Sequence, residues 1–217
     1  TSHNEFQVVD AFSRVVRLGD GMGHTGRMSK QAMDRAIEAL KACADKLNRR
    51  RVGQVRSVAT EACRKARNGG EFVHRVYQET GIALDVISPA EEARLAVLGC
   101  QTLIDHQAPA TLVFDIGGGS TEVVLLEHQH HSQQRHTHHR IARRRPDLLG
   151  FGSQKMRRWL SIPWGVVSLS DTEPLDAGSQ TARLDAYLRM KARVARELQP
   201  LARMARMDMQ LLGASGT

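Results

Sequence analysis

The sequence predicts an α/β protein with mixed sheets and flanking helices. Up to about residue 110, short strand-like runs alternate with stretches in which apolar residues recur at helical spacing. Beyond that point, a glycine-rich turn joins two apolar runs so tightly that they should pair as a hairpin. Apolar residues make up 41% of the 217 residues and aromatic ones only 4%, so we expect a core of aliphatic side chains and methionine.

Capping and turn residues place the elements of the first half. Ser29 is a suitable N-cap, and the apolar stripe after it predicts a helix as far as about Leu47. Gly81 suits a helix C-terminus and ends a predicted helix over 71–80. The remaining predictions are strands at 6–9, 13–18, 52–58 and 82–87, and a short helix at 61–66.

The second half begins with a helix of about 15 residues that opens at Ser88. Strands are predicted at 111–114, 122–126, 162–169 and 209–212, with a helix over 184–201 before the last of them. The stretch from Gln129 to Arg158 differs from the rest, because it is rich in His and Arg and poor in apolar residues. We expect it to be an insertion that leaves the sheet.

Charge and cysteine content narrow the class of protein. Lys plus Arg exceeds Asp plus Glu by 31 to 23, and this net charge of +8 favours polyanionic partners without selecting among nucleic acid, anionic lipid and polyphosphate. The three cysteines form no Cys-x-x-Cys pair and no disulfide framework, which is typical of the reducing cytoplasm. The sequence has no run of about 18 apolar residues, so we expect no membrane span.

The strongest motif is Asp115-Ile-Gly-Gly-Gly-Ser-Thr-Glu122, which lies between two predicted strands. Its three glycines would let backbone N–H groups approach an anion closely, and Ser120 adds a hydroxyl donor. Asp115 and Glu122 flank the turn, where they are suited to hold a divalent cation that offsets phosphate charge. The alternative is a tight hairpin with acidic ends and no ligand.

A second motif opens the helix after Ile87. Ser88 and Glu91 fit the capping box S-x-x-E, in which the Glu91 side chain reaches back to the Ser88 N–H. Glu92 has no such duty and lies about 100° farther around the helix, so its carboxylate is a candidate general base for a water molecule. From this segment alone, a favourable first-turn charge on the helix dipole is the better explanation of Glu92.

Several further features are weaker. Arg64 and Arg67 are candidate clamps for phosphate oxygens, although a solvated basic face is the simpler explanation, and Cys63 is expected to be a buried apolar residue. The terminal segment 213–217 is either a second phosphate-contacting loop or a plain turn. A histidine cluster lacks the spacing of a zinc site and predicts only adventitious metal affinity; its members are His128, His130, His131, His136, His138 and His139.

In their order along the chain, these motifs resemble the exopolyphosphatase / guanosine pentaphosphate phosphohydrolase family. The matching segments are 16–21, 58–68, 86–95, 115–122 and 162–167, which read VRLGDG, VATEACRKARN, VISPAEEARL, DIGGGSTE and IPWGVV. The resemblance covers nearly the whole chain except 129–158. Single segments are unspecific, whereas the joint match is specific.

The resemblance implies an actin/sugar-kinase/Hsp70-like fold, in which two ribonuclease-H-like lobes flank a cleft. We accordingly expect a first lobe over 1–106 and a second over 107–217, with the insertion at about 129–158. It also implies Mg²⁺-assisted attack of water on a terminal phosphoanhydride. The family's catalytic positions fall on Glu92 and Asp115, its phosphate contacts on Arg64, Gly117, Gly118, Gly119 and Ser120, and its cation ligands on Asp115 and Glu122.

The chain departs from the family at both ends. It lacks a first phosphate loop of the form D-x-G-S/T-N-S, and the family continues beyond the turn at 213–217, so we expect a truncated chain with one wall of the cleft missing. The expected substrates are inorganic polyphosphate or guanosine pentaphosphate, with no membrane and no specific nucleic acid as partner, and a homodimer stays open. The alternatives are a phosphotransferase of the same fold class and a non-catalytic polyanion-binding module.

Overall fold

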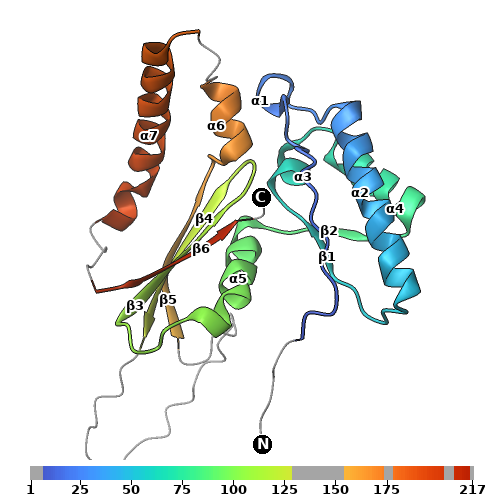
Figure 1. Ribbon diagram of the computed structural model, residues 1–217, viewed down its shortest axis with the longest axis horizontal. Coiled ribbons are helices and arrows are strands. Elements are labelled where there is room, and N and C mark those ends of the chain that lie inside the picture. Colours follow the sequence, from blue (N-terminus) through green and yellow to red (C-terminus); the bar gives the residue numbers. More distant parts are fainter. Residues whose placement is uncertain (1–6, 129–153, 174–177, 203–207, 216–217) are drawn as a thin grey trace, which may run out of the picture.

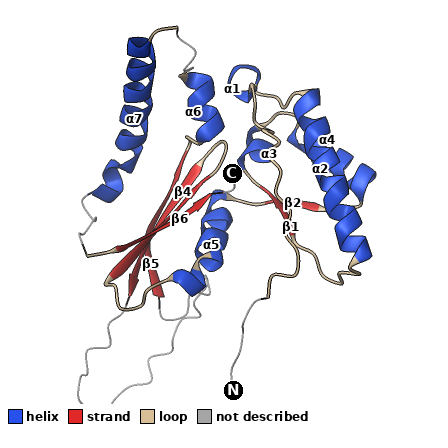
Figure 2. Cartoon of the chain, in the orientation of Figure 1, coloured by secondary structure: helices blue, strands red, loops and turns tan. Residues whose placement is uncertain are grey.

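The computed structural model describes residues 7–128, 154–173, 178–202 and 208–215. Its strands form a two-stranded and a four-stranded sheet, and helix α5 (Pro89–Gly99) lies between them (Figure 1). Helices flank both sheets (Figure 2). We call the elements before α5 the small-sheet half and those from α5 onward the large-sheet half.

The small-sheet half comprises α1 (Met22–Thr25), α2 (Lys30–Arg49), β1 (Ser57–Ala59), α3 (Glu61–Lys65), α4 (Gly69–Thr80) and β2 (Leu84–Val86). β1 and β2 are parallel, and Val58 lies opposite Asp85. A parallel pair needs a crossover connection, which α3 and α4 provide. Ser29 caps α2 as predicted, because its Oγ accepts a hydrogen bond from the Ala32 N–H at 3.1 Å.

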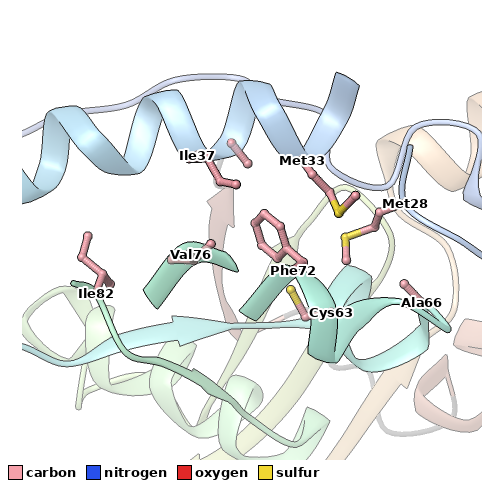
Figure 3. Close-up of a cluster of buried hydrophobic side chains, with 9 residues drawn as sticks. Met28, Met33, Ile37, Cys63, Ala66, Phe72, Val76 and Ile82 are labelled. Atoms are coloured by element: carbon pink, nitrogen blue, oxygen red, sulfur yellow. The ribbon is translucent and has the colours of Figure 1, made fainter. Parts of the chain in front are cut away.

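The core of this half lies between α2, α3 and α4. Ile37 from α2 and Phe72 and Val76 from α4 are at most 2% exposed and pack together (Figure 3). Cys63 on α3 joins them, and burial raises the pKa of its thiol to about 11. Cys63 is therefore a buried apolar residue, as the sequence predicts, rather than a nucleophile.

The strands predicted at 6–9 and 13–18 are wrong for residues 7–18, which form no strand. Val8 is 81% exposed and Val15 65%. The apolar pattern suits a strand, but a strand needs a neighbour for its N–H and C=O groups, and no described segment pairs with this one. The strand predicted at 52–58 likewise shrinks to Ser57–Ala59, because β2 offers pairing for only three residues.

The large-sheet half contains α5, a 3₁₀ turn (Gln101–Leu103), β3 (Ala110–Ile116), β4 (Thr121–His128), β5 (Gln154–Ile162), α6 (Val166–Thr172), α7 (Gln180–Ala202) and β6 (Gln210–Ser215). The strand order is β5-β4-β3-β6. β3 runs antiparallel to β4 and parallel to β6, so the sheet is mixed and the predicted hairpin is confirmed. Asp115 on β3 lies directly opposite Glu122 on β4.

The two faces of this sheet are covered by different helices. On one face, Ala93 and Val97 of α5 pack against Val113, Val124 and other alternate residues of β3 and β4. On the opposite face, Leu201 of α7 packs against a second cluster of strand residues, which includes Val123 and Leu112. Side chains alternate along a strand, so Asp115 and Glu122 lie on the α5 face.

Two predictions for this half need correction. The strand predicted at 162–169 is wrong, because β5 ends at Ile162 and α6 begins at Val166. Residues 154–158, assigned to the insertion, belong to β5, while 129–153 lie outside the described residues. No helix in the described part of the chain is long and apolar enough to cross a membrane.

Candidate phosphate-binding cleft

The glycine loop Gly117–Ser120 joins β3 to β4 and is closed by a hydrogen bond from the Gly117 N–H to the Ser120 carbonyl at 2.9 Å. Its outward carbonyl groups are bound by the start of α6. The N–H groups of Val166 and Val167 donate to the carbonyls of Gly117 and Gly118, at 3.0 and 2.8 Å. The Ser168 hydroxyl donates to the third carbonyl, that of Gly119, at 3.1 Å.

This clamp fixes the direction of the loop's donors. In a trans peptide, the N–H points opposite to the carbonyl of the preceding residue, and no described peptide is cis. Because the carbonyls of Gly117, Gly118 and Gly119 all face α6, the N–H groups of Gly118, Gly119 and Ser120 face away from it. Three N–H groups that point the same way form an anion-binding arrangement. The start of α6, which lies in the segment 162–169 predicted as a strand, therefore orients the loop.

Close contact explains the glycine at the clamp. A Cβ added at Gly165 would overlap the backbone of Gly117 and Gly118. The loop and α6 can therefore meet only where residue 165 has no side chain.

Three carboxylates gather at the end of the sheet on the α5 face. Glu122 is 1% exposed and accepts a hydrogen bond from the Ser161 hydroxyl at 2.9 Å. Burial, with the nearby charge of Glu92 next in size, raises the pKa of Glu122 to about 7. Burial also raises the pKa of Asp115 and that of Glu92. The charge of Asp115 adds to the rise at both glutamates, so the three groups interact electrostatically.

Arg64 on α3 supplies the cation of this cluster. Its guanidinium donates to Glu92 Oε2 at 2.9 Å and to the Ile87 carbonyl at 2.7 Å. The side chains of Arg64 and Glu92 are only 18% and 13% exposed, so the ion pair is largely shielded from water. Arg67, the other candidate clamp, packs against Gly26 instead. The structure thus brings Arg64, and not Arg67, to Glu92.

Glu91 has a different environment from Glu92, one residue away. The Ser88 hydroxyl accepts from the Glu91 N–H at 3.2 Å, so the first half of the predicted capping box is present. The Glu91 carboxylate, predicted to bind the Ser88 N–H, instead accepts two hydrogen bonds from Arg94 and one from Arg56. Arg94 and Arg56 lower the pKa of Glu91 to about 2.

A cavity of about 920 Å³ is lined by residues of both halves. Arg64, Asp115 and Glu122 lie outside its lining. The small-sheet half contributes Thr60 and Glu61 to its wall, α5 contributes Glu92, and the large-sheet half contributes the loop from Gly117 to Ser120. The sequence predictions missed Glu61, which lies in the VATEACR segment. Its contact with the loop is with Gly119, 58 residues along the chain, and no local pattern indicates it.

The remaining predicted sites have separate outcomes. Gly213 lies within β6 opposite Phe114, so the predicted turn at 213 is wrong, and residues 216–217 lie outside the described residues. Among the histidines of the cluster only His128 is described, and its Nε2 lies 2.8 Å from the Thr111 hydroxyl. The other five lie outside the described residues.

The donor set at Asp115 and Glu122 fits a hard cation. Within the described ranges, no group of three or more His, Cys, Asp or Glu side chains is arranged to hold a metal ion on its own. Mg²⁺, however, is usually bound by one or two carboxylates together with substrate phosphates and water. Asp115 and Glu122, which lie opposite each other on β3 and β4, offer the oxygen donors that such an arrangement uses.

The fold and the cleft together define a two-sheet α/β protein in which a glycine loop of the large-sheet half faces the small-sheet half across a cavity. A model of the Ppx/GppA phosphatase family matches residues 1–217, and the chain belongs to this family.

Known proteins support this assignment. The chain is 37% identical over 133 residues to exopolyphosphatase 2 of Mycobacterium tuberculosis, an alignment that covers 59% of this chain and 42% of that protein. Among solved structures, an exopolyphosphatase from Cytophaga hutchinsonii superimposes with a TM-score of 0.69 at 26% identity, covering 90% of this chain and 55% of the other. The Ppx/GppA enzyme of Aquifex aeolicus gives 0.59 at 27% identity, with 92% and 56% covered.

These comparisons confirm the predicted actin/sugar-kinase/Hsp70-like fold class. The chain spans about two fifths of the curated relative and somewhat more than half of the solved structures.

Proposed function

We propose that the chain forms the cleft of a phosphohydrolase that releases terminal phosphate from inorganic polyphosphate. One observation carries the proposal: the Glu92 carboxylate, whose pKa is raised by burial, shares a cavity with a glycine loop whose carbonyls are held by α6, which leaves its N–H groups pointing away from that helix. Two of the relatives are named exopolyphosphatases. The net charge of +8 suits a polyanionic substrate.

In the proposed reaction, the N–H groups of Gly118, Gly119 and Ser120 bind the terminal phosphoryl group and stabilise the charge that develops on its oxygens. Glu92 accepts a proton from a water molecule, whose oxygen then attacks the phosphorus. The P–O bond to the bridging oxygen breaks, and the products are inorganic phosphate and a chain shorter by one unit. The raised pKa makes Glu92 a better proton acceptor than an exposed glutamate.

Arg64 and Asp115 have supporting roles in this proposal. Arg64 holds the Glu92 carboxylate through a hydrogen bond at 2.9 Å, and its remaining donors are of the kind that bind phosphate oxygens. Asp115 adds a second carboxylate on the α5 face of the sheet. Asp115 and Glu122 would hold Mg²⁺, which offsets phosphate charge when bound.

Guanosine pentaphosphate is the second candidate substrate, since it ends in the same phosphoanhydride. The positive charge also favours a non-catalytic polyanion-binding role, and the fold class includes phosphotransferases. These alternatives differ in a single observable. A hydrolase releases phosphate with water alone, a phosphotransferase needs an acceptor, and a binding module releases none.

The test is phosphate release from long-chain polyphosphate and from guanosine pentaphosphate, with and without Mg²⁺. It is run on the 217-residue chain and on a form extended at both ends with the corresponding segments of a full-length relative. Metal-dependent release that Glu92→Gln abolishes, with polyphosphate binding retained, supports the proposal. Binding without release in either form favours the polyanion-binding module and contradicts the hydrolase.

A further inference from the structure

Glu61, the first residue of α3, is a buried carboxylate outside the cluster described above. The residue is 7% exposed and its side chain 10%. One carboxylate oxygen, Oε1, pairs with Lys65 one turn along the same helix. The other, Oε2, is fully buried and has no hydrogen-bond partner among the described residues.

The unpartnered oxygen lies against the glycine loop. A Cβ added at Gly119 would overlap Glu61 Oε2, so the carboxylate occupies the space where that side chain would be. This contact crosses the cleft, because α3 belongs to the small-sheet half and the loop to the large-sheet half. The loop lies between α6 on one side and α3 on the other (Figure 1). The loop's carbonyls face α6 and Glu61 lies on the other side of the loop, but no N–H group of the loop donates a hydrogen bond to Oε2.

A buried carboxylate oxygen without a donor is costly, and a protein retains such a group only where something else depends on it. The Glu61 carboxylate lies beside the loop at Gly119, where a phosphate group bound to the loop would meet it. The carboxylate resembles one edge of a phosphate group in charge and in its two oxygens.

We propose that Glu61 is a built-in competitor for the phosphate site of this loop. Its carboxylate stands at Gly119 when the site is empty, gives way when a substrate phosphoryl group binds, and weakens the hold on inorganic phosphate after hydrolysis. The inference rests on the proposed function, because it needs the loop to bind phosphate. Lys65, 58% exposed and part of the same cavity wall, retains the displaced carboxylate through their ion pair.

The test is the affinity of the chain for inorganic phosphate, measured by isothermal titration calorimetry. Glu61→Gln keeps the shape and removes the charge. The variant no longer places a carboxylate beside the bound phosphate, so it should bind phosphate about tenfold more tightly. Glu61→Asp keeps the charge but withdraws it from Gly119, and should give a smaller gain. Glu71→Gln is the control, because Glu71 is 63% exposed on the neighbouring helix.

The outcomes separate the two proposals. If the unmodified chain binds phosphate and Glu61→Gln binds it equally well, the competitor role of Glu61 is wrong, while the proposal that the loop binds phosphate is retained. Weaker phosphate binding by Glu61→Gln that added Mg²⁺ restores would make Glu61 a cation ligand and overturn the competitor role as well. If neither protein binds phosphate, although both are folded by circular dichroism, the loop is not an anion site and the proposed function falls with the inference.

Discussion

The first turn of α5 carries two neighbouring glutamates, Glu91 and Glu92, whose carboxylates lie in different environments. Glu91 faces outward, where Arg94 and Arg56 bind its carboxylate and lower its pKa to about 2. Glu92 faces the cleft, where burial raises the pKa of its carboxyl group although Arg64 opposes the rise. The residues are neighbours in sequence, and one step along a helix turns a side chain by about 100°.

The difference shows what converts an ordinary helix-start carboxylate into a candidate base. Both glutamates are favourable charges near the helix N-terminus, so the dipole alone does not distinguish them. The surrounding partners distinguish them. Arg94 and Arg56 make Glu91 a weak proton acceptor, whereas burial beside two further carboxylates makes Glu92 a stronger one.

Replacing each of the two glutamates by glutamine should give the largest difference in activity. We expect Glu92→Gln to lower phosphate release about a hundredfold or more, because a positioned base contributes that much to proton transfer. Glu91→Gln, the matched control, should retain most of the activity. Release of inorganic phosphate from polyphosphate is the measurement. Equal losses in the two variants would show that the helix start, and not the cleft, requires the charge.

The cations on the two sides should also differ in their contribution to stability. Arg64→Met leaves the Ile87 carbonyl and Glu92 without a largely buried donor, and we expect it to lower the free energy of unfolding by about 2–3 kcal/mol. Arg56→Met removes a 53% exposed partner of Glu91 and should have little effect. Urea unfolding at neutral pH measures both. A larger loss for Arg56→Met would reverse the comparison.

The pH dependence of stability should reveal the buried cluster. Because the pKa of Glu122 in the folded chain is about 7, against 4.5 for the unfolded group, the folded state binds more protons between these values. The free energy of unfolding therefore falls as pH rises from about 4.5 to 7, by about 3 kcal/mol from this residue in metal-free buffer.

Glu122→Gln should remove that contribution and leave the chain more stable than the unmodified one above pH 7. Urea titrations at pH 5 and 7.5 on both proteins isolate the effect, since all other groups are shared. Parallel pH profiles for the two proteins would argue against a protonated Glu122.

The cap of α5 should give the smallest effect. Ser88→Ala removes the acceptor of the Glu91 N–H and should cost about 1 kcal/mol of stability, while Ser88→Thr should restore most of it. Thermal unfolding followed by circular dichroism measures the difference. An alanine variant as stable as the unmodified chain would mean that packing alone holds the first turn.

The parts of the site that depend on local sequence could be predicted. The glycine turn between two apolar runs gives the hairpin, and the hairpin alone places Asp115 opposite Glu122. The cap at Ser88 fixes the phase of α5 and leaves Glu92 outside the capping interaction. Of the two partners of Glu91, Arg94 lies three residues along the same helix and is a local i,i+3 pair, whereas Arg56 lies 35 residues away and no local pattern reports it.

The parts of the site that depend on contacts between distant segments could not be predicted from the sequence. The apolar run at 164–167 suits a strand, but its N–H groups bind the carbonyls of Gly117 and Gly118, and this tertiary contact starts a helix instead. Glu122 accepts from Ser161, which becomes its neighbour only through the register of β4 and β5. The contact of Glu61 with Gly119 likewise joins two halves of the fold.

The most direct test is a titration of the Glu91 and Glu92 side-chain carboxyl carbons by NMR, assigned with the two glutamine variants, in metal-free buffer. The structure predicts that Glu91 titrates near pH 2 and that Glu92 titrates above 4.5. Two glutamates that titrate together near 4.5 would contradict the account, since the cleft would then give Glu92 no advantage as a base.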